Sequence, residues 1–176
     1  GELRGLVASV VASAEIRGAV IAGITNCFCA GAELTEVAAL DGTQALNFSA
    51  LGQSVMRAIE RSPKPFVAAI SGYCMGGGFD LALACHMRIA APDAVFAHRG
   101  ASLGIITGWG GTQRLARAIG PRGASVAREV MLTGREIRAQ EAHDLGLLSR
   151  IVPAEKLVDE AIALVALHGS RDGLAS

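Results

Sequence analysis

The stretch from Gly76 to Asp80 places three consecutive glycines just before a carboxyl group, at the start of an otherwise apolar run. Backbone N–H groups at a glycine turn that opens a helix point outward, with the positive end of the helix dipole behind them, so they suit a partial negative charge. Glycine is needed there because a Cβ would block close approach. Burial one turn further on would raise the pKa of Asp80 and suit it to acid–base chemistry. The stretch therefore predicts an anion-stabilising turn beside a general acid or base.

A second turn of similar design lies earlier in the chain. The apolar segment Gly18–Ile24 is followed by a loop whose small residues, Gly31 and Ala32, lead into a helix carrying Glu33 and Glu36. Two such turns after parallel strands would place two N–H donors side by side, as an oxyanion hole requires. Close packing of helix against strand is the structural alternative for the glycines Gly76–Gly78.

Three side chains have alternative interpretations. Asp80 is either catalytic or a carboxylate satisfied by the helix dipole or a buried arginine. His98 has the intrinsic pKa of a base near neutral pH, but a lone histidine in a loop is often a surface residue. Trp109, the single tryptophan, either walls a substrate pocket or packs in the core.

The elements that position these residues alternate between strand and helix patterns. Apolar runs predict strands at Gly18–Ile24, Phe66–Ile70, Met87–Ala91, Val95–Ala97 and Ser149–Val152. Helices are expected at Glu2–Ala14, Thr43–Arg61 with Thr43 as N-cap, Phe79–Ala84, Thr112–Ile119 with Thr112 as cap, Ser125–Leu132, Arg138–Asp144 and Pro153–His168. The long loop His98–Gly111 is typical of a functional segment. The alternation indicates an α/β protein with a largely parallel sheet.

The composition and the missing motifs argue against several classes of function. The 176 residues are 51% hydrophobic, which suits a real core, and 16 basic residues balance 16 acidic ones. This balance gives no support to a nucleic-acid or membrane partner. No apolar run is long enough to span a bilayer. Neither a P-loop nor a dinucleotide-binding glycine motif is present.

Four cysteines lie in apolar stretches without CxxC pairing. We interpret them as buried free thiols, which indicates a reducing, cytoplasmic location. A zinc site from Cys27, Cys29, Cys85 and His86 is possible by residue type, but the spacing matches no common finger. We therefore expect no metal.

Four motifs together resemble the enoyl-CoA hydratase/isomerase, or crotonase, superfamily. They are FCAGAEL (Phe28–Leu34), VAAISGYCMGGGFDLALAC (Val67–Cys85), LGIITGWGGTQRLARAIG (Leu103–Gly120) and TGREIRAQEAHDLGLLSRIVPAEKL (Thr133–Leu157). Ordered matches across most of a chain are far more specific than one glycine motif. The resemblance implies a spiral of ββα turns with C-terminal helices. It predicts a spiral core over residues 1–120 and a helical C-terminal region over 121–176, both shorter than in the family, with the first strands and last helices absent.

The resemblance also implies site residues. The oxyanion hole would be formed by the N–H groups of Ala32 and Gly77, and Asp80 would occupy the position of the family's first catalytic glutamate. The second glutamate position falls on Gly100, where His98, two residues earlier, would be the replacement base.

Residues expected to line the path of coenzyme A are Ala30, Glu33 and Leu34, with Trp109 as a further binding residue. The implied partner is an acyl-CoA thioester, with coenzyme A as part of the substrate and no separate cofactor. The implied assembly is a homotrimer or hexamer.

We therefore expect an acyl-CoA enzyme, enoyl-CoA hydratase-like, that stabilises a thioester enolate. The missing second carboxylate keeps isomerase, decarboxylase and thioester hydrolase activities open, together with a non-catalytic acyl-CoA-binding protein.

Overall fold

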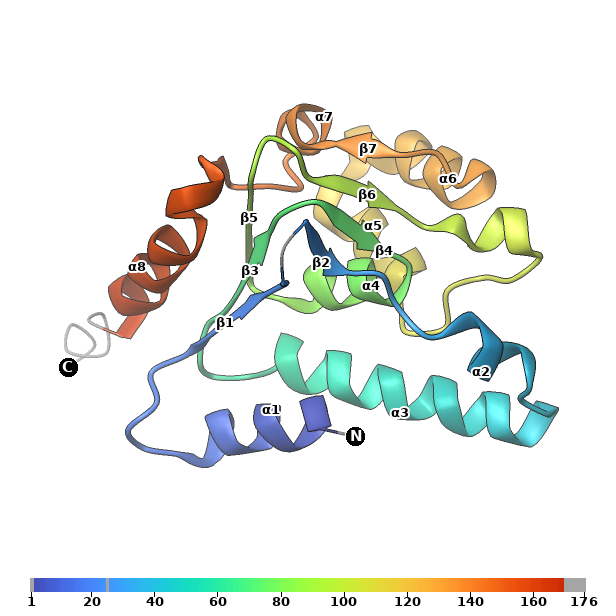
Figure 1. Ribbon diagram of the computed structural model, residues 1–176, viewed down its shortest axis with the longest axis horizontal. Helices are drawn as coiled ribbons and strands as arrows, with labels where there is room; N and C mark the ends of the chain where they lie inside the picture. The colour runs from blue at the N-terminus through green and yellow to red at the C-terminus, as the bar shows by residue number, and fades with distance from the viewer. Residues whose placement is uncertain (1, 25, 170–176) are drawn as a thin grey trace.

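The chain winds as a spiral in which each turn gives one strand to each of two sheets and then continues into helix (Figure 1). The computed structural model describes residues 2–24 and 26–169, except the side chains of residues 122, 168 and 169. An opening helix, α1 (Glu2–Ala12), precedes the spiral. The first turn comprises β1 (Ala19–Ala22), β2 (Cys27–Cys29), α2 (Leu34–Ala38) and α3 (Gly42–Glu60). The second comprises β3 (Phe66–Ile70), β4 (Tyr73–Met75) and α4 (Gly77–Ala84). The third comprises β5 (Met87–Ala90), β6 (Val95–Ala97), the 3₁₀ helix η1 (Arg99–Leu103) and α5 (Gly111–Ile119).

The strands form two four-stranded sheets, ordered β1-β3-β5-β8 and β2-β4-β6-β7. All pairings in the first sheet are parallel, and only the β6–β7 pairing in the second is antiparallel. Parallel pairing brings successive strand ends to one edge, so the segments that leave β2, β4 and β6 are neighbours. This edge carries the predicted functional turns.

The chain after residue 120 adds the last strand of each sheet. Its elements are η2 (Pro121–Gly123), α6 (Ala124–Thr133), β7 (Ile137–Arg138), α7 (Ala139–Asp144), β8 (Arg150–Ile151), η3 (Ala154–Lys156) and α8 (Leu157–Gly169). The division at residue 120 stays a prediction, and residues 170–176 of the expected second region lie outside the described residues.

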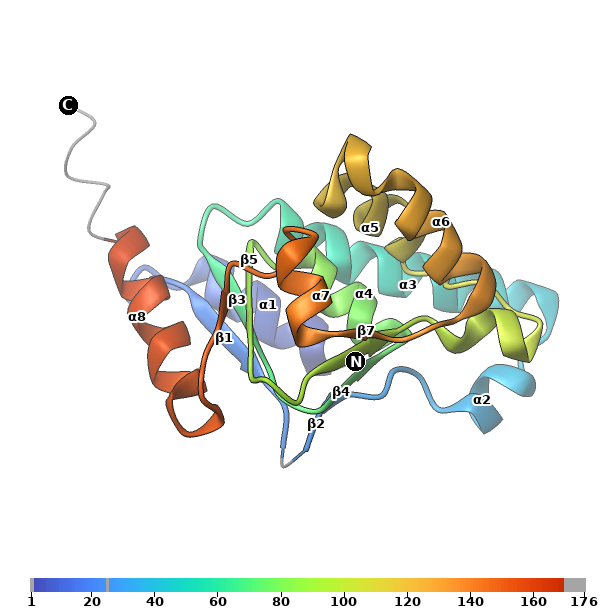
Figure 2. The same cartoon turned by 90° about the horizontal axis from the view of Figure 1, so that it is seen from above.

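β3 is the centre of the core, and all five of its residues are buried. Ala68 and Ile70 join the larger hydrophobic cluster, while Val67 and Ala69 pack in a second cluster with the start of α8. Burial on both faces explains why β3 is a continuous apolar run rather than an alternating one. In both views α8 lies at one end of the molecule and α2 at the other (Figures 1 and 2).

The structure corrects four local predictions. β1 is half-buried, and Ile24, expected in this strand, is 87% exposed. Asp41, not Thr43, caps α3, in a capping box with Gln44. Gly110 precedes α5, so Thr112 lies inside that helix and does not cap it. Of the four cysteines, all free, Cys74 and Cys85 are buried, whereas Cys27 and Cys29 are partly exposed.

Candidate active site

The two predicted N–H turns lie next to each other. β2 and β4 pair in parallel with Cys29 opposite Cys74, so the turns that follow them leave the sheet together. Gly31 has a φ of +100°, and a Cβ there would lie 3.0 Å from the backbone nitrogen of Gly77. Only glycine suits this positive φ at such close approach. The adjoining Ala32 and Gly77 face one shared cavity.

This cavity has a volume of about 460 Å³ and a largely apolar lining. Ala30, Leu34 and Trp109 are among its lining residues, as expected of groups along a substrate path. Val37 and Phe48 of the first spiral turn complete part of the apolar wall. A concave, mostly apolar site with a few polar groups is the usual form of a small-molecule pocket.

Glu33 does not line the cavity. Its carboxylate accepts hydrogen bonds from the backbone N–H of Thr35 at 3.3 Å and from the Thr35 hydroxyl at 3.1 Å. The side chain thus caps α2. Its predicted contact with coenzyme A stays a prediction.

Asp80 lies one turn inside α4, behind the cavity wall, with no exposed surface. Oδ2 accepts a hydrogen bond from the Thr107 hydroxyl, while Oδ1 has no hydrogen-bond partner of normal geometry. Burial raises the pKa of Asp80 to about 6, although the Thr107 hydrogen bond and the Arg114 charge oppose this rise. A carboxyl group with this pKa can exchange a proton near neutral pH.

His98 is buried beside Asp80, not on the surface. Its Nε2 lies 3.5 Å from Oδ1 of Asp80, and its ring stacks on Phe79 with centroids 4.8 Å apart. Burial lowers the pKa of His98 to about 4, so its ring is neutral above that pH. The residue also lines the cavity, which joins it to the predicted site.

Thr107 is a site residue that the sequence did not reveal. It lines the cavity and donates its hydroxyl proton to buried Asp80, so it stands between the acid and the cavity. Threonine in a glycine-rich loop has no distinctive pattern. The available signal was its place inside the third motif, 27 residues after the acid.

Gly100 lies in a tight loop. A Cβ at this position would lie 2.4 Å from the backbone oxygen of Ile105. The Ile105 N–H donates to the Gly100 carbonyl at 2.9 Å, which holds the two segments together. Apolar side chains, Leu103 and Ile106, line the cavity near this loop. The loop as it stands has no room for a second carboxylate at residue 100.

Trp109 both packs and lines the cavity. Its indole contacts α3 and α4, because a Cβ on Gly52 would lie 2.1 Å from Nε1 and one on Gly77 would lie 2.4 Å from Cζ3. The ring also packs on Phe48, with centroids 5.2 Å apart. The two interpretations of Trp109 therefore hold together.

Comparison with known proteins shows the family of this chain. The model of the family described as enoyl-CoA hydratase/isomerase matches residues 2–170. The chain belongs to this family. A crotonyl-CoA hydratase of Syntrophomonas wolfei is 40% identical over 148 residues, covering 84% of this chain and 56% of that protein. A probable enoyl-CoA hydratase of Bacillus subtilis is 43% identical, covering 87% of this chain and 59% of that protein.

The fold prediction is confirmed by solved structures. An enoyl-CoA hydratase from Bacillus anthracis superposes with a TM-score of 0.86 at 38% identity, covering 94% of this chain and 63% of that one. The ββα spiral of the crotonase fold is thus the fold of this chain. The chain spans 56–63% of the length of these three relatives.

Among residues 2–24 and 26–169, no three His, Cys, Asp or Glu side chains gather closely enough to hold a metal ion. None of the helices within the same residues is long and apolar enough to cross a membrane.

Proposed function

We propose that the protein carrying this chain hydrates the double bond of a 2-enoyl-CoA thioester. Three observations support this proposal. The chain belongs to the hydratase/isomerase family, its two N–H turns adjoin, and an apolar cavity lies in front of them. In this arrangement the thioester carbonyl lies between the N–H groups of Ala32 and Gly77. These donors stabilise the negative charge that oxygen gains as the enolate forms.

The observation that carries the mechanism is the hydrogen bond from Thr107 to Asp80. Asp80 has no exposed surface, so its proton exchange with the cavity passes through the Thr107 hydroxyl. A water molecule attacks C3 of the substrate, and the C2–C3 π electrons move to the thioester as an enolate. The water gives a proton to the Thr107 oxygen, which passes its own proton to Asp80. The reverse transfer protonates C2, so substrate plus water becomes the 3-hydroxyacyl-CoA and Asp80 is ionised again.

Isomerisation of the double bond is the second candidate, and the closed loop at Gly100 favours it. Without a carboxylate at residue 100, Asp80 is the one buried carboxylate among the described residues. One base can remove a proton from C2 of a 3-enoyl-CoA and return it to C4, which gives the conjugated 2-enoyl thioester without water. Decarboxylation, thioester hydrolysis and simple acyl-CoA binding remain the further alternatives.

The test is the absorbance of the conjugated thioester of crotonyl-CoA, mixed with this chain in its natural sequence context. We expect loss of absorbance with formation of 3-hydroxybutyryl-CoA, and loss of this activity in Asp80→Asn. Conversion of a 3-enoyl-CoA to the conjugated isomer, without hydration, would replace the first candidate by the second. Binding without any turnover would leave an acyl-CoA-binding protein.

We further propose a homotrimer or hexamer located in the cytoplasm, with coenzyme A entering as part of the substrate. The resemblance to the crotonase family supports the assembly, and four free cysteines support a reducing compartment. Light scattering coupled to gel filtration tests the assembly, since a monomer at micromolar concentration would contradict it.

A further inference from the structure

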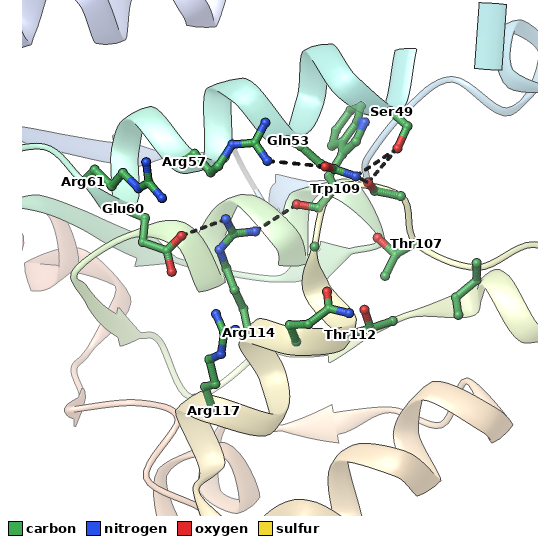
Figure 3. Close-up of a pocket in the computed structure, with 14 residues that line it drawn as sticks. Ser49, Gln53, Arg57, Glu60, Arg61, Thr107, Trp109, Thr112, Arg114 and Arg117 are labelled. Atoms are coloured by element: carbon green, nitrogen blue, oxygen red, sulfur yellow. Dashed lines mark hydrogen bonds and ion pairs between the residues drawn. The ribbon is translucent and has the colours of Figure 1, made fainter. Parts of the chain in front are cut away.

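A second cavity, with a volume of about 480 Å³, lies between α3 and α5 and is rich in arginine. Figure 3 shows Arg57 and Glu60 on α3, and Arg61 at the C-cap of that helix, facing Arg114 and Arg117 on α5. The cavity shares part of its wall with the apolar one, because the loop around Thr107 and Trp109 lines both. The two cavities therefore adjoin at one short segment, residues 106–109.

One of the four arginines already has a carboxylate partner. Arg114 is buried, and its Nη2 pairs with Glu60 Oε2 at 2.9 Å. Its Nη1 donates to the Trp109 carbonyl at 2.9 Å (Figure 3). Arg114 therefore joins α3, α5 and the shared loop, and it uses the single carboxylate that lines this cavity.

The other three arginines have no carboxylate partner in the part of the chain that the structure describes. Within residues 2–24 and 26–169, no ion pair involves Arg57, Arg61 or Arg117. Arg57 makes only a long hydrogen bond, 3.5 Å, to Gln53 Oε1. Three like charges around one concavity repel one another, in a chain whose overall charge is zero. An anion in the cavity would remove this repulsion.

We propose that this cavity binds an oxyanion, a carboxylate or phosphate group of a small molecule. The planar guanidinium group donates two parallel hydrogen bonds to such a group, which distinguishes arginine from a simple point charge. Polar side chains on α5, Thr112 and Gln113, line the same cavity and can donate further hydrogen bonds. The anion has three sources: a carboxylate at the far end of the acyl group in the adjoining cavity, a phosphate of coenzyme A, or a separate small molecule.

Inorganic phosphate is the probe, titrated calorimetrically at low ionic strength into this chain in its natural sequence context. We expect saturable binding that weakens at least about tenfold in the triple variant R57Q/R61Q/R117Q, because charge-assisted hydrogen bonds are lost. The triple lysine variant R57K/R61K/R117K keeps the charge but loses the bidentate geometry, so its affinity should fall between the two. Arg128→Gln, an exposed arginine on α6 outside the cavity, is the matched control and should bind as the parent does. Thermal melting of each variant shows that it is folded.

Phosphate that does not saturate, or that binds the triple glutamine variant as tightly as the parent, would overturn the proposal. This arm needs no turnover, so it stands even if the proposed hydratase activity fails. Kinetics with crotonyl-CoA and with its ω-carboxylated counterpart, glutaconyl-CoA, then separate the sources. A loss of kcat/KM in the triple variant for glutaconyl-CoA alone identifies the acyl carboxylate. An equal rise of KM for both thioesters identifies a phosphate of coenzyme A, and unchanged kinetics with retained phosphate binding identify a separate anion.

Discussion

Nε2 of His98 lies 3.5 Å from Oδ1 of Asp80, and neither atom has a hydrogen-bond partner of normal geometry. Burial shifts the pKa values of the two groups in opposite directions. The pKa of Asp80 rises from 3.8 to about 6, and that of His98 falls from 6.5 to about 4. Between these values the folded pair holds its proton on Asp80, whereas the unfolded chain holds it on His98.

This exchange of the proton predicts how the free energy of unfolding depends on pH. Single variants separate the contribution of Asp80 from that of His98. The contribution of Asp80 to the free energy of unfolding is present below pH 3.8 and is lost as pH rises to about 6. That of His98 is present above pH 6.5 and is lost as pH falls to about 4. The two contributions change with pH in opposite directions. We therefore expect the free energy of unfolding of the parent to depend little on pH between these pKa values.

In His98→Gln, the free energy of unfolding should fall by about 3 kcal/mol as pH rises across the Asp80 window, at about 1.4 kcal/mol per pKa unit. In Asp80→Asn it should rise with pH by a similar amount. Urea unfolding at several pH values between 4 and 7 measures both. Identical slopes in the parent and both variants would show that the two groups do not titrate as described.

Thr107 should control the acid limb of the pH profile, which is the fall of kcat/KM at low pH. As a general base Asp80 must be ionised, so we expect kcat/KM to fall about tenfold per unit as pH drops below about 6. Thr107→Val removes the hydrogen bond that lowers the pKa of Asp80 and also the proton path, so the limb should move to higher pH and kcat should drop about 100-fold or more.

Thr107→Ser is the matched control for this prediction, because it keeps the hydroxyl group. Its pH profile should follow that of the parent. A valine variant with an unshifted limb and parental kcat would remove Thr107 from the mechanism and leave it a packing residue.

Gly31 should be essential for the predicted oxyanion hole. A Cβ there lies against the Gly77 nitrogen, so Gly31→Ala should displace that donor and lower kcat about 100-fold or more. Gly146→Ala isolates the backbone strain, since Gly146 also has a positive φ but has open space around its Cβ position. Steady-state kinetics on both variants, normalised to the folded fraction, make the comparison. Equal activities in the two would mean that the Gly31 turn does not position a catalytic donor.

The sequence predicted those parts of the fold that have a strong local pattern. Phe66–Ile70 was assigned with its exact limits as β3 because burial on both faces requires an uninterrupted apolar run. Strands β2 and β4 were missed because three residues are too few for a periodic pattern, and exposed Tyr73 breaks the apolar run. The cap of α3 could have been found, since Asp41 and Gln44 have capping-box spacing.

The site was predictable in its backbone but not in its side-chain partners. The turns at Gly31 and Gly77 could be predicted because the sequence shows where the glycines lie, and the backbone freedom of glycine suits such turns. The contact between His98 and Asp80, and the hydrogen bond from Thr107, join segments 18 and 27 residues apart. Such contacts depend on how the third spiral turn packs on the second, and no local pattern records this.

Gly100 provides a test of whether the chain works without a second carboxylate. Gly100→Glu introduces the second glutamate that the family resemblance implies at this position. Its Cβ would lie 2.4 Å from the Ile105 carbonyl oxygen. This backbone atom cannot move without disturbing the loop that lines the cavity, so we expect a loss of about 1–3 kcal/mol in stability and no gain in hydration of crotonyl-CoA. Gly100→Ala, which introduces the same contact without the carboxylate, is the control and should lose similar stability. A rise in kcat for the glutamate variant above that of both the parent and the alanine variant would show that the loop adapts and that hydration here is limited by the missing acid.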